Sequence, residues 1–330
     1  MAGEFALIER LLNQAGVASA MPAPSLLLGP GDDCALIAPP ENGTAWAITT
    51  DMLVEGTHFL ATDDPENLGW KTLAVNLSDL AAMGAQPRYV TLAVALSADD
   101  ASSGWVDQFF RGFSACAQQF GVALIGGDTT RGPRTFCVTA IGSVQPGQAL
   151  RRNGAQDQDD IWISGNPGLA ALGLAYKLGT TTLAPTLAAL ASKALHRPLP
   201  RVALGLALTG LAHSCLDVSD GLLQDLGHIT TASGLAATLQ QAALPATPTG
   251  VNEALWQHCL LGGGDDYELL FTAPAAAREA LTALSSQLDL PLHRIGQMHA
   301  DGTAGRIDLL DTQQQPIDLA SVRHGYDHFA

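Results

Sequence analysis

The chain has 330 residues, 47% of them hydrophobic and 5% aromatic, so it is long enough for two domains with Ala-, Leu- and Val-rich cores and is not intrinsically disordered. Its 32 acidic residues outnumber 16 basic ones and give a formal charge of −16, which disfavours nucleic acid and anionic membranes as partners. The five cysteines are far apart and form no Cys-x-x-Cys pair, which disfavours a zinc site and a disulfide framework. With no run of the ~18 apolar residues that cross a bilayer, we expect a soluble, cytoplasmic protein.

The first part of the chain alternates predicted helices and strands. Apolar residues at helical spacing, with Glu4 and Glu9 among them, predict an amphipathic N-terminal helix rather than a signal peptide. Longer helical periods cover 66–83 and 101–120, and Asp64-Pro65 is a typical helix start. Short runs rich in β-branched residues predict strands at 45–50, 89–96, 122–125 and 136–144.

A polar segment divides the chain into two predicted domains. Residues 145–159 contain Pro146, Gly147 and several Gln and Asp residues, a composition typical of a linker. We therefore expect a first domain at 1–144 and a second at 160–330.

The second domain also mixes both kinds of element. A strand is predicted at 160–164, followed by a long Ala- and Leu-rich helical stretch at 168–212, with further strands at 215–218 and 269–272. Strands mixed with helices in both halves predict α+β or α/β domains, without defining the strand order.

Six segments place a small residue directly before an aspartate, several of them after strand-like runs, where loops commonly carry sites. They are Gly31-Asp32-Asp33, Thr49-Thr50-Asp51, Ser78-Asp79, Gly126-Gly127-Asp128-Thr129-Thr130, Asp217-Val218-Ser219-Asp220-Gly221 and Gly264-Asp265-Asp266. Carboxylates and hydroxyls are the hard oxygen ligands that Mg²⁺ and Ca²⁺ prefer. Any single Gly-Asp is more often a turn than a ligand. Two interpretations stay open: ordinary turns, or a shared metal site that holds a polyphosphate.

The familiar phosphate-binding motifs are absent. No Gly-Lys pair occurs, which excludes a P-loop, and neither the protein-kinase loops nor an EF-hand nor a Gly-x-Ser-x-Gly elbow is present. An ATP enzyme with this sequence would use a rarer fold. Arg151-Arg152 could clamp a phosphate or be a solvated linker pair, and His58 could be structural or belong to the site near Asp51.

Several of these motifs, in this order, resemble the thiamine-monophosphate kinase family, of the aminoimidazole-ribonucleotide synthetase superfamily. They are Gly31-Asp32-Asp33-Cys34-Ala35, Asn-Leu-Ser-Asp-Leu-Ala-Ala-Met-Gly at 76–84, Ile-Gly-Gly-Asp-Thr-Thr-Arg-Gly-Pro at 125–133, and the segments 217–221, 263–269 and 325–329. The resemblance covers nearly the whole chain. It implies two α+β domains of the aminoimidazole-ribonucleotide synthetase-like fold, a homodimer paired through the first domain, and ATP in the groove between the domains.

The resemblance also implies roles for individual residues. Several Mg²⁺ ions would be bound by Asp33, Thr49, Thr50, Asp51, Asp79, Asp128, Asp217 and Asp220. ATP would be contacted by Gly127, Asp128, Arg152 and Ser219. Thiamine monophosphate would be contacted by His58, Asp265 and Arg323. Two of these depart from the family, which commonly has Glu in place of Asp265 and an aromatic residue in place of Arg323, for which Tyr326 could substitute.

The implied reaction transfers the γ-phosphoryl group of ATP to the phosphate of thiamine monophosphate and gives thiamine diphosphate. A phosphate monoester has its second pKa near ~6, so the nucleophile is already ionised and no catalytic base is assigned. Two alternatives stay open. One is another ATP-dependent synthetase of the superfamily, although the first cysteine, Cys34, lies within an aspartate motif and the chain does not end in Cys. The other is a non-catalytic protein stabilised by Ca²⁺.

Overall fold

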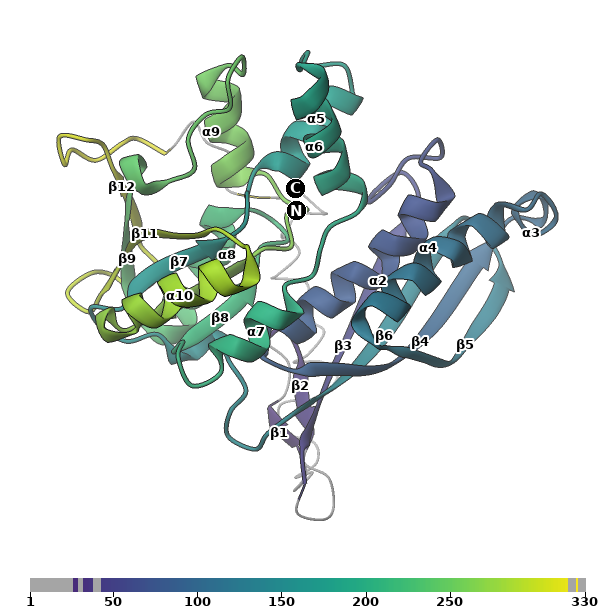
Figure 1. Ribbon diagram of the computed structural model, residues 1–330, viewed down its shortest axis with the longest axis horizontal. Helices are drawn as coiled ribbons and strands as arrows, with labels where there is room; N and C mark the ends of the chain where they lie inside the picture. The colour runs from purple at the N-terminus through teal and green to yellow at the C-terminus, as the bar shows by residue number, and fades with distance from the viewer. Residues whose placement is uncertain (1–25, 29–31, 38–42, 320–324, 326–330) are drawn as a thin grey trace.

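The computed structural model describes residues 26–28, 32–37, 43–319 and 325, and it contains two six-stranded sheets, each with its own helices (Figure 1). The predicted N-terminal helix lies outside the described residues. In the part of the chain that is described, no helix is both long enough and apolar enough to cross a membrane. The expected α+β class is confirmed.

The first sheet has the strand order β1-β2-β3-β6-β4-β5. Neighbouring strands are antiparallel except β4 and β5, which are parallel. The strands are β1 (Leu26–Leu28), β2 (Ala35–Ile37), β3 (Ala45–Val54), β4 (Gln86–Leu96), β5 (Ala123–Arg131) and β6 (Thr135–Val144). The four strands predicted here are confirmed, but β3 and β5 are longer than expected. As a result Asp51 and Asp128 lie within strands rather than on loops.

Helices cover one face of this sheet (Figure 1). They are α2 (Pro65–Ala82), α3 (Ala98–Ser102) and α4 (Trp105–Phe120). The side chain of Asp64 caps α2 by accepting from the Asn67 N–H at 2.8 Å, as the Asp-Pro start predicts. The single helix expected at 101–120 is divided, because Gly104 has a left-handed φ of 77° between α3 and α4. Helices α2 and α4 pack closely, since a Cβ on Gly69 would lie 1.9 Å from the Phe109 carbonyl oxygen.

The second sheet has the strand order β12-β9-β11-β7-β10-β8, antiparallel except for the β9–β12 pair. Its strands are β7 (Asp160–Ser164), β8 (Ser214–Asp217), β9 (Ala236–Gln240), β10 (Leu269–Ala273), β11 (Leu292–His299) and β12 (Ile307–Leu310). One apolar cluster joins this sheet to α8 (Leu222–Ser233), and another joins it to α7 (Val202–Leu208) and α10 (Arg278–Leu288). The sheet is therefore covered on both faces. The expected linker lies between β6 and β7, which belong to different sheets.

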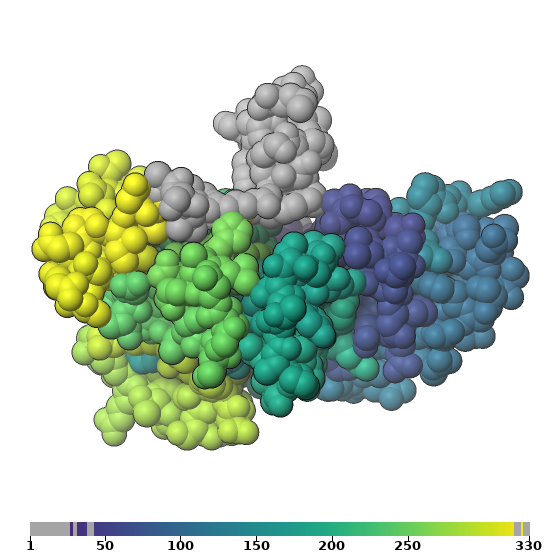
Figure 2. Space-filling view, turned by 90° about the horizontal axis from the view of Figure 1, so that it is seen from above, coloured from purple at the N-terminus to yellow at the C-terminus, as the bar shows by residue number. Residues whose placement is uncertain are grey.

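The long helical stretch expected at 168–212 is three helices, α5 (Leu169–Lys177), α6 (Pro185–His196) and α7. Pro185 begins α6, and Pro198 and Pro200 separate it from α7, because proline lacks the N–H that continues a helix. With α9 (Glu253–Gly262), α5 and α6 form a small cluster around Leu172 and Trp256. Figure 2 shows α5 and α6 (teal) between the green segments of the second domain and the purple segments of the first. Three short 3₁₀ turns complete the elements: η1 (Arg152–Gly154), η2 (Gln241–Ala243) and η3 (Ala275–Ala277).

Helix α2 belongs to the first domain and also contacts the second. Ala81 and Ala82, in its last turn, are part of the apolar cluster that contains Trp162 and Phe271 of the second sheet. A Cβ on Gly205 of α7 would lie 2.0 Å from the Ala81 carbonyl oxygen, so the two helices can cross only where a side chain is missing. The C-terminal end of α2 is thus held against the second domain. This contact determines where the polar residues of α2 meet the second domain.

Candidate metal and phosphate site

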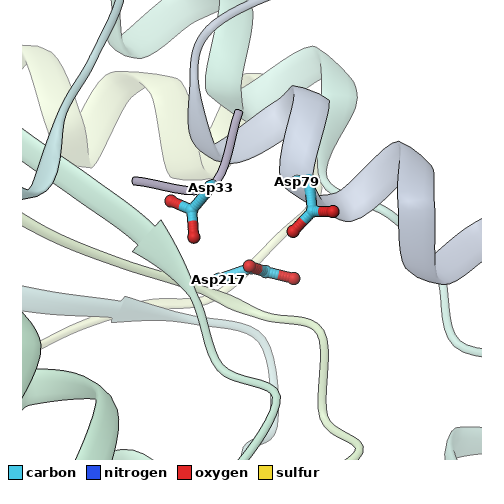
Figure 3. A group of neighbouring side chains, drawn as sticks. All are labelled: Asp33, Asp79 and Asp217. Atoms are coloured by element: carbon cyan, nitrogen blue, oxygen red, sulfur yellow. The ribbon is translucent and has the colours of Figure 1, made fainter. Parts of the chain in front are cut away.

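Three carboxylates from both halves of the chain meet at one point (Figure 3). Asp33 precedes β2, Asp79 is on α2, and Asp217 ends β8. Each offers an oxygen, and these oxygens all lie within 4.8 Å of one another. In Figure 3 the three side chains approach a common centre from three separate segments. The oxygen-only donor set and this spacing suit a hard divalent cation such as Mg²⁺.

Neighbouring residues hold the first-domain carboxylates in place. The Thr49 hydroxyl donates to Asp79 Oδ2 at 2.6 Å. The guanidinium of Arg152 forms an ion pair with Asp33, and the Arg152 backbone N–H donates to Asp32 Oδ2 at 3.1 Å. These contacts join the linker between the two sheets to the acidic loop of the first domain.

Asn76 fixes Asp51 relative to α2. The Asn76 side chain is fully buried, and its Oδ1 accepts from the Asp51 N–H at 3.0 Å. Asn76 and Asp79 are three residues apart on α2 and therefore share a face. The β3 strand is held against the helix at the point where the carboxylates gather.

The loop after β8 is held by a second set of contacts. Asp225, buried in the first turn of α8, accepts from the backbone N–H groups of Asp220 and Gly221, both at 3.1 Å. The Asp265 N–H donates to the Ser219 carbonyl at 2.8 Å. Asp217, Ser219 and Asp220 are therefore presented by a loop with a defined backbone, and all three line the adjoining cavity.

The carboxylates are electrostatically strained without a cation. Burial, opposed by Arg152 and reinforced by Asp217 and Asp32, raises the pKa of Asp33 to about 7. Burial chiefly raises the pKa of Asp51 and of Asp217 to about 6, and that of Asp79 well above its ordinary value. Within the described residues, Asp33 Oδ2 is buried and has no hydrogen-bond partner. A buried carboxylate oxygen without a donor, among like charges, fits a bound cation.

A cavity of 620 Å³ adjoins the cluster. Its acidic end is lined by Asp51, Asp79, Asp217 and Asp220. The remaining wall includes Leu68, Leu174, Leu178, Leu195 and Leu255, contributed by both domains. The cavity therefore combines carboxylates that could hold a cation with a leucine-rich wall that also carries polar side chains, a lining that suits a small phosphorylated molecule.

His58 and Asp265, the expected substrate contacts, both line this cavity. His58 Nδ1 accepts from the Val54 N–H at 3.0 Å, so a neutral His58 carries its proton on Nε2. Asp265 forms an ion pair of 2.8 Å with Lys71 of α2. The third expected contact, Arg323, lies outside the described residues.

Most of the expected site residues are brought together, but three positions on the first sheet are not. The Thr50 hydroxyl is exposed and lies 2.9 Å from Thr139 Oγ1, because alternation along β3 directs it to the opposite face from Thr49 and Asp51. Gly127 and Asp128 lie on the edge strand β5, all of whose residues are exposed.

The strand registers show how far Gly127 lies from Asp51, which is beside the carboxylate cluster. They align Asp51 with Val138, Val138 with Leu92, and Leu92 with Gly127. Three strand spacings correspond to ~14 Å, so Asp128 is not part of the cluster within one chain.

Two residues of the site have contacts that sequence reasoning missed. The hydrogen bond that joins Asn76 to β3 is not evident from the sequence. Lys71 also lines the cavity; the signal for it in the sequence is that it is one of only three lysines and lies eight residues before Asp79, on the same face of α2.

Residues 31–144, which include Asp33, Asp51 and Asp79 and most of the first sheet, match the family described as AIR synthase related protein, N-terminal domain. The thiamine-monophosphate kinase of Salmonella typhimurium is 42% identical over 332 residues, which cover 99% of this chain and 98% of that protein. The chain belongs to the thiamine-monophosphate kinase family.

Solved structures agree with this assignment. The crystal structure of thiamine-monophosphate kinase from Stenotrophomonas maltophilia K279a is 47% identical with a TM-score of 0.76, and the match covers 93% of this chain and 96% of that one. The structure of AaThiL complexed with AMPPCP and TMP is 25% identical with a TM-score of 0.80, and covers 99% and 97%. The similarity thus extends over both domains.

Proposed function

We propose that this chain performs the reaction for which its family is named, the ATP-dependent phosphorylation of thiamine monophosphate to thiamine diphosphate. The observation that carries the proposal is the cluster of Asp33, Asp79 and Asp217, with ligand oxygens within 4.8 Å of one another at one end of the cavity. A relative of the same fold is complexed with AMPPCP and TMP, which supports ATP and thiamine monophosphate as the two substrates.

Asp33, Asp51, Asp79, Asp217 and Asp220 are proposed to hold Mg²⁺, which when bound would offset the charge of the phosphates and align them for transfer. The chain's own residues position the reactants. The Thr49 hydroxyl and the Asn76 amide keep the carboxylates of α2 and β3 in register. The substrate phosphate is already ionised at neutral pH, so the site needs no base, and none is assigned. The leucine-lined part of the cavity would exclude water from the acceptor side.

Arg152 and Ser219 are proposed to contact ATP, since they lie on either side of the cluster. Arg152 lies in the linker and reaches Asp33, and Ser219 lines the cavity beside Asp217. A guanidinium already at the cluster can turn one of its unused N–H groups toward a phosphate. We divide the chain accordingly into an ATP- and metal-binding domain at 1–144, a linker at 145–159 and a second α+β domain at 160–330.

We further propose that the first domain pairs with a second copy of this chain, and that Gly127 and Asp128 serve the site of that copy. Their distance of ~14 Å from Asp51 supports a role in the other subunit. Leu124 and Ile125 on β5 are 45% and 57% exposed, and Met52 on β3 is 52% exposed. A second copy would cover these side chains.

Mixing two inactive variants tests this pairing. Asp128→Asn and Asp217→Asn are each expected to be inactive as separate proteins. Dissociated and reassociated together, they should recover about a quarter of wild-type activity, because half of the dimers would be mixed and each would hold one intact site. No recovery, or a wild-type monomer in sedimentation equilibrium at working concentration, would contradict the proposal.

The function is tested by ADP release with thiamine monophosphate and with thiamine. We expect Mg²⁺-dependent ADP release with the monophosphate and essentially none with thiamine, which lacks the ionised phosphate nucleophile. A panel of other small acceptors is the control. Release with another acceptor and none with thiamine monophosphate would favour another synthetase of the superfamily.

A further inference from the structure

The wall of the cavity contains a buried cation that the proposed reaction has not used. Helix α2 presents Leu68, Lys71, Val75 and Asp79 to the cavity, the spacing of one helix face. Eight residues separate Lys71 from Asp79, which corresponds to ~12 Å along the helix. Along the helix, the backbone of Lys71 is therefore separated from that of Asp79 by about the length of a small phosphorylated heterocycle.

Lys71 is held against Asp265 of the second domain. The ammonium nitrogen lies 2.8 Å from Asp265 Oδ2, and the two side chains are 6% and 33% exposed, respectively. Both side chains line the cavity, and the carboxylate is the more exposed of the two. The second oxygen, Oδ1, accepts from the Tyr267 hydroxyl at 3.1 Å.

The backbone also restricts Asp265. Its φ is 71°, a left-handed value that is uncommon for a residue other than glycine. Its N–H donates to Ser219 O at 2.8 Å, on the loop that carries Asp217 and Asp220. The direction of the carboxylate is therefore set at three points: the backbone, Lys71 and Tyr267.

The charges around this carboxylate decide what it can recognise. Lys71 and Asp265 together carry no net charge. The nearby Lys177 forms its own ion pair, with Asp63. Burial, together with Lys177 and Lys71, lowers the pKa of His196 to about 4, so this histidine is neutral at pH 7. A carboxylate neutralised in this way attracts a free cation weakly, but its remaining lone pairs still accept a hydrogen bond.

We propose that Lys71 is a positioning residue that holds Asp265 so that its carboxylate accepts a hydrogen bond from an N–H donor at the ring end of the substrate. In thiamine monophosphate the donor of this kind is the exocyclic amino group of the pyrimidine. The pair thereby selects an amino-bearing ring from one that carries an oxygen at the same place. This inference rests on the proposed function.

The probe is oxythiamine monophosphate, in which a carbonyl oxygen replaces that amino group. The wild-type protein is expected to favour thiamine monophosphate in kcat/KM by on the order of 10- to 100-fold, since a buried acceptor left without its donor is unfavourable. In Lys71→Met this preference should fall to within about threefold, because the KM for thiamine monophosphate rises. The KM for ATP should stay unchanged. Unchanged selectivity in Lys71→Met, or an equal rise in both KM values, would overturn the inference.

The chain offers matched controls among its lysines. Lys193 is exposed on α6, away from the cavity, and Lys193→Met should leave both KM values unchanged. Lys71→Arg keeps the charge and should retain most of the selectivity. Lys71→Met and Asp265→Asn should not be additive when combined, because the lysine acts through the aspartate. Additive effects would show that Lys71 touches the substrate directly and would contradict a positioning role.

Two outcomes separate this inference from its premises. If the wild-type protein transfers no phosphoryl group to thiamine monophosphate, the proposed function fails first. If Lys71→Met does not fold, Tyr267→Phe removes only the other side-chain contact of Asp265. That variant should lower the same preference, and a full wild-type preference in it would overturn the inference.

Discussion

Asp217→Asn is expected to lower kcat by ~10³-fold or more while the protein remains folded. Asp217 is 6% exposed and supplies the second domain's oxygen to a cluster whose other two oxygens come from the first domain. Asparagine keeps the shape but removes the negative charge, so the affinity for a divalent cation falls. Steady-state kinetics at saturating ATP and thiamine monophosphate, over a range of Mg²⁺ concentrations, measures the effect.

The fold of this variant can be checked independently. Removing one of several buried like charges should leave the melting temperature in EDTA unchanged or higher, because the repulsion that raises the carboxylate pKa values is relieved. Asp99→Asn, an exposed aspartate on α3, is the matched control and should keep wild-type kcat. A near-normal kcat for Asp217→Asn together with an unchanged Mg²⁺ dependence would remove this residue from the metal site.

Mg²⁺ binding is expected to weaken on the order of 10²- to 10⁴-fold between about pH 8 and pH 5. Burial and neighbouring carboxylates raise the pKa of Asp33 to about 7 and those of Asp51 and Asp217 to about 6. At pH 8 these groups are ionised and ready to bind the cation. At pH 5 they hold protons that the cation must displace. Calorimetric titration in buffers of different ionisation enthalpy measures both the affinity and the protons released.

The same pKa values fix the sign of the stability change. Each folded-state value is above the ordinary value of 3.8, so its contribution to stability is complete below about pH 4 and is lost as the pH rises to about 7. In EDTA the melting temperature should therefore be higher near pH 5 than near pH 8. Mg²⁺ should raise it strongly at pH 8 and little at pH 5. Equal Mg²⁺ effects at the two values would contradict the account.

The elements with clear boundary residues could be predicted from the sequence. Helix α2 was expected within one residue of its observed ends, because Asp64-Pro65 and Gly84 bound it. The stretch 168–212 was expected to be continuous because its Ala and Leu content outweighed Pro185, Pro198 and Pro200, which break it. Strands β9, β11 and β12 were not predicted, since their mixed composition has no clear alternation.

The residue types of the site could be predicted from the sequence, but their arrangement in space could not. The repeated aspartates indicated a metal site, and Asp33, Asp79 and Asp217 do converge. Period-two alternation along β3 already separates the Thr50 side chain from those of Thr49 and Asp51, so the sequence itself carries this distinction.

Other features of the site depend on tertiary contacts that local patterns do not encode. Asp128 is separated from Asp51 by the strand order β3-β6-β4-β5, and periodicity does not contain this order. The Lys71–Asp265 pair joins residues 194 positions apart. Such a contact depends on how the two domains are packed.

The central claim is that the carboxylate cluster and the cavity together transfer a phosphoryl group from ATP to the phosphate of thiamine monophosphate. Phosphorus NMR of the complete reaction tests it most directly, because it identifies the bond that forms. We predict that the single resonance of thiamine monophosphate is replaced by the two coupled resonances of a diphosphate ester, in step with ADP and only when Mg²⁺ is present. Inorganic phosphate appearing with ADP while the thiamine monophosphate resonance persists would contradict the claim.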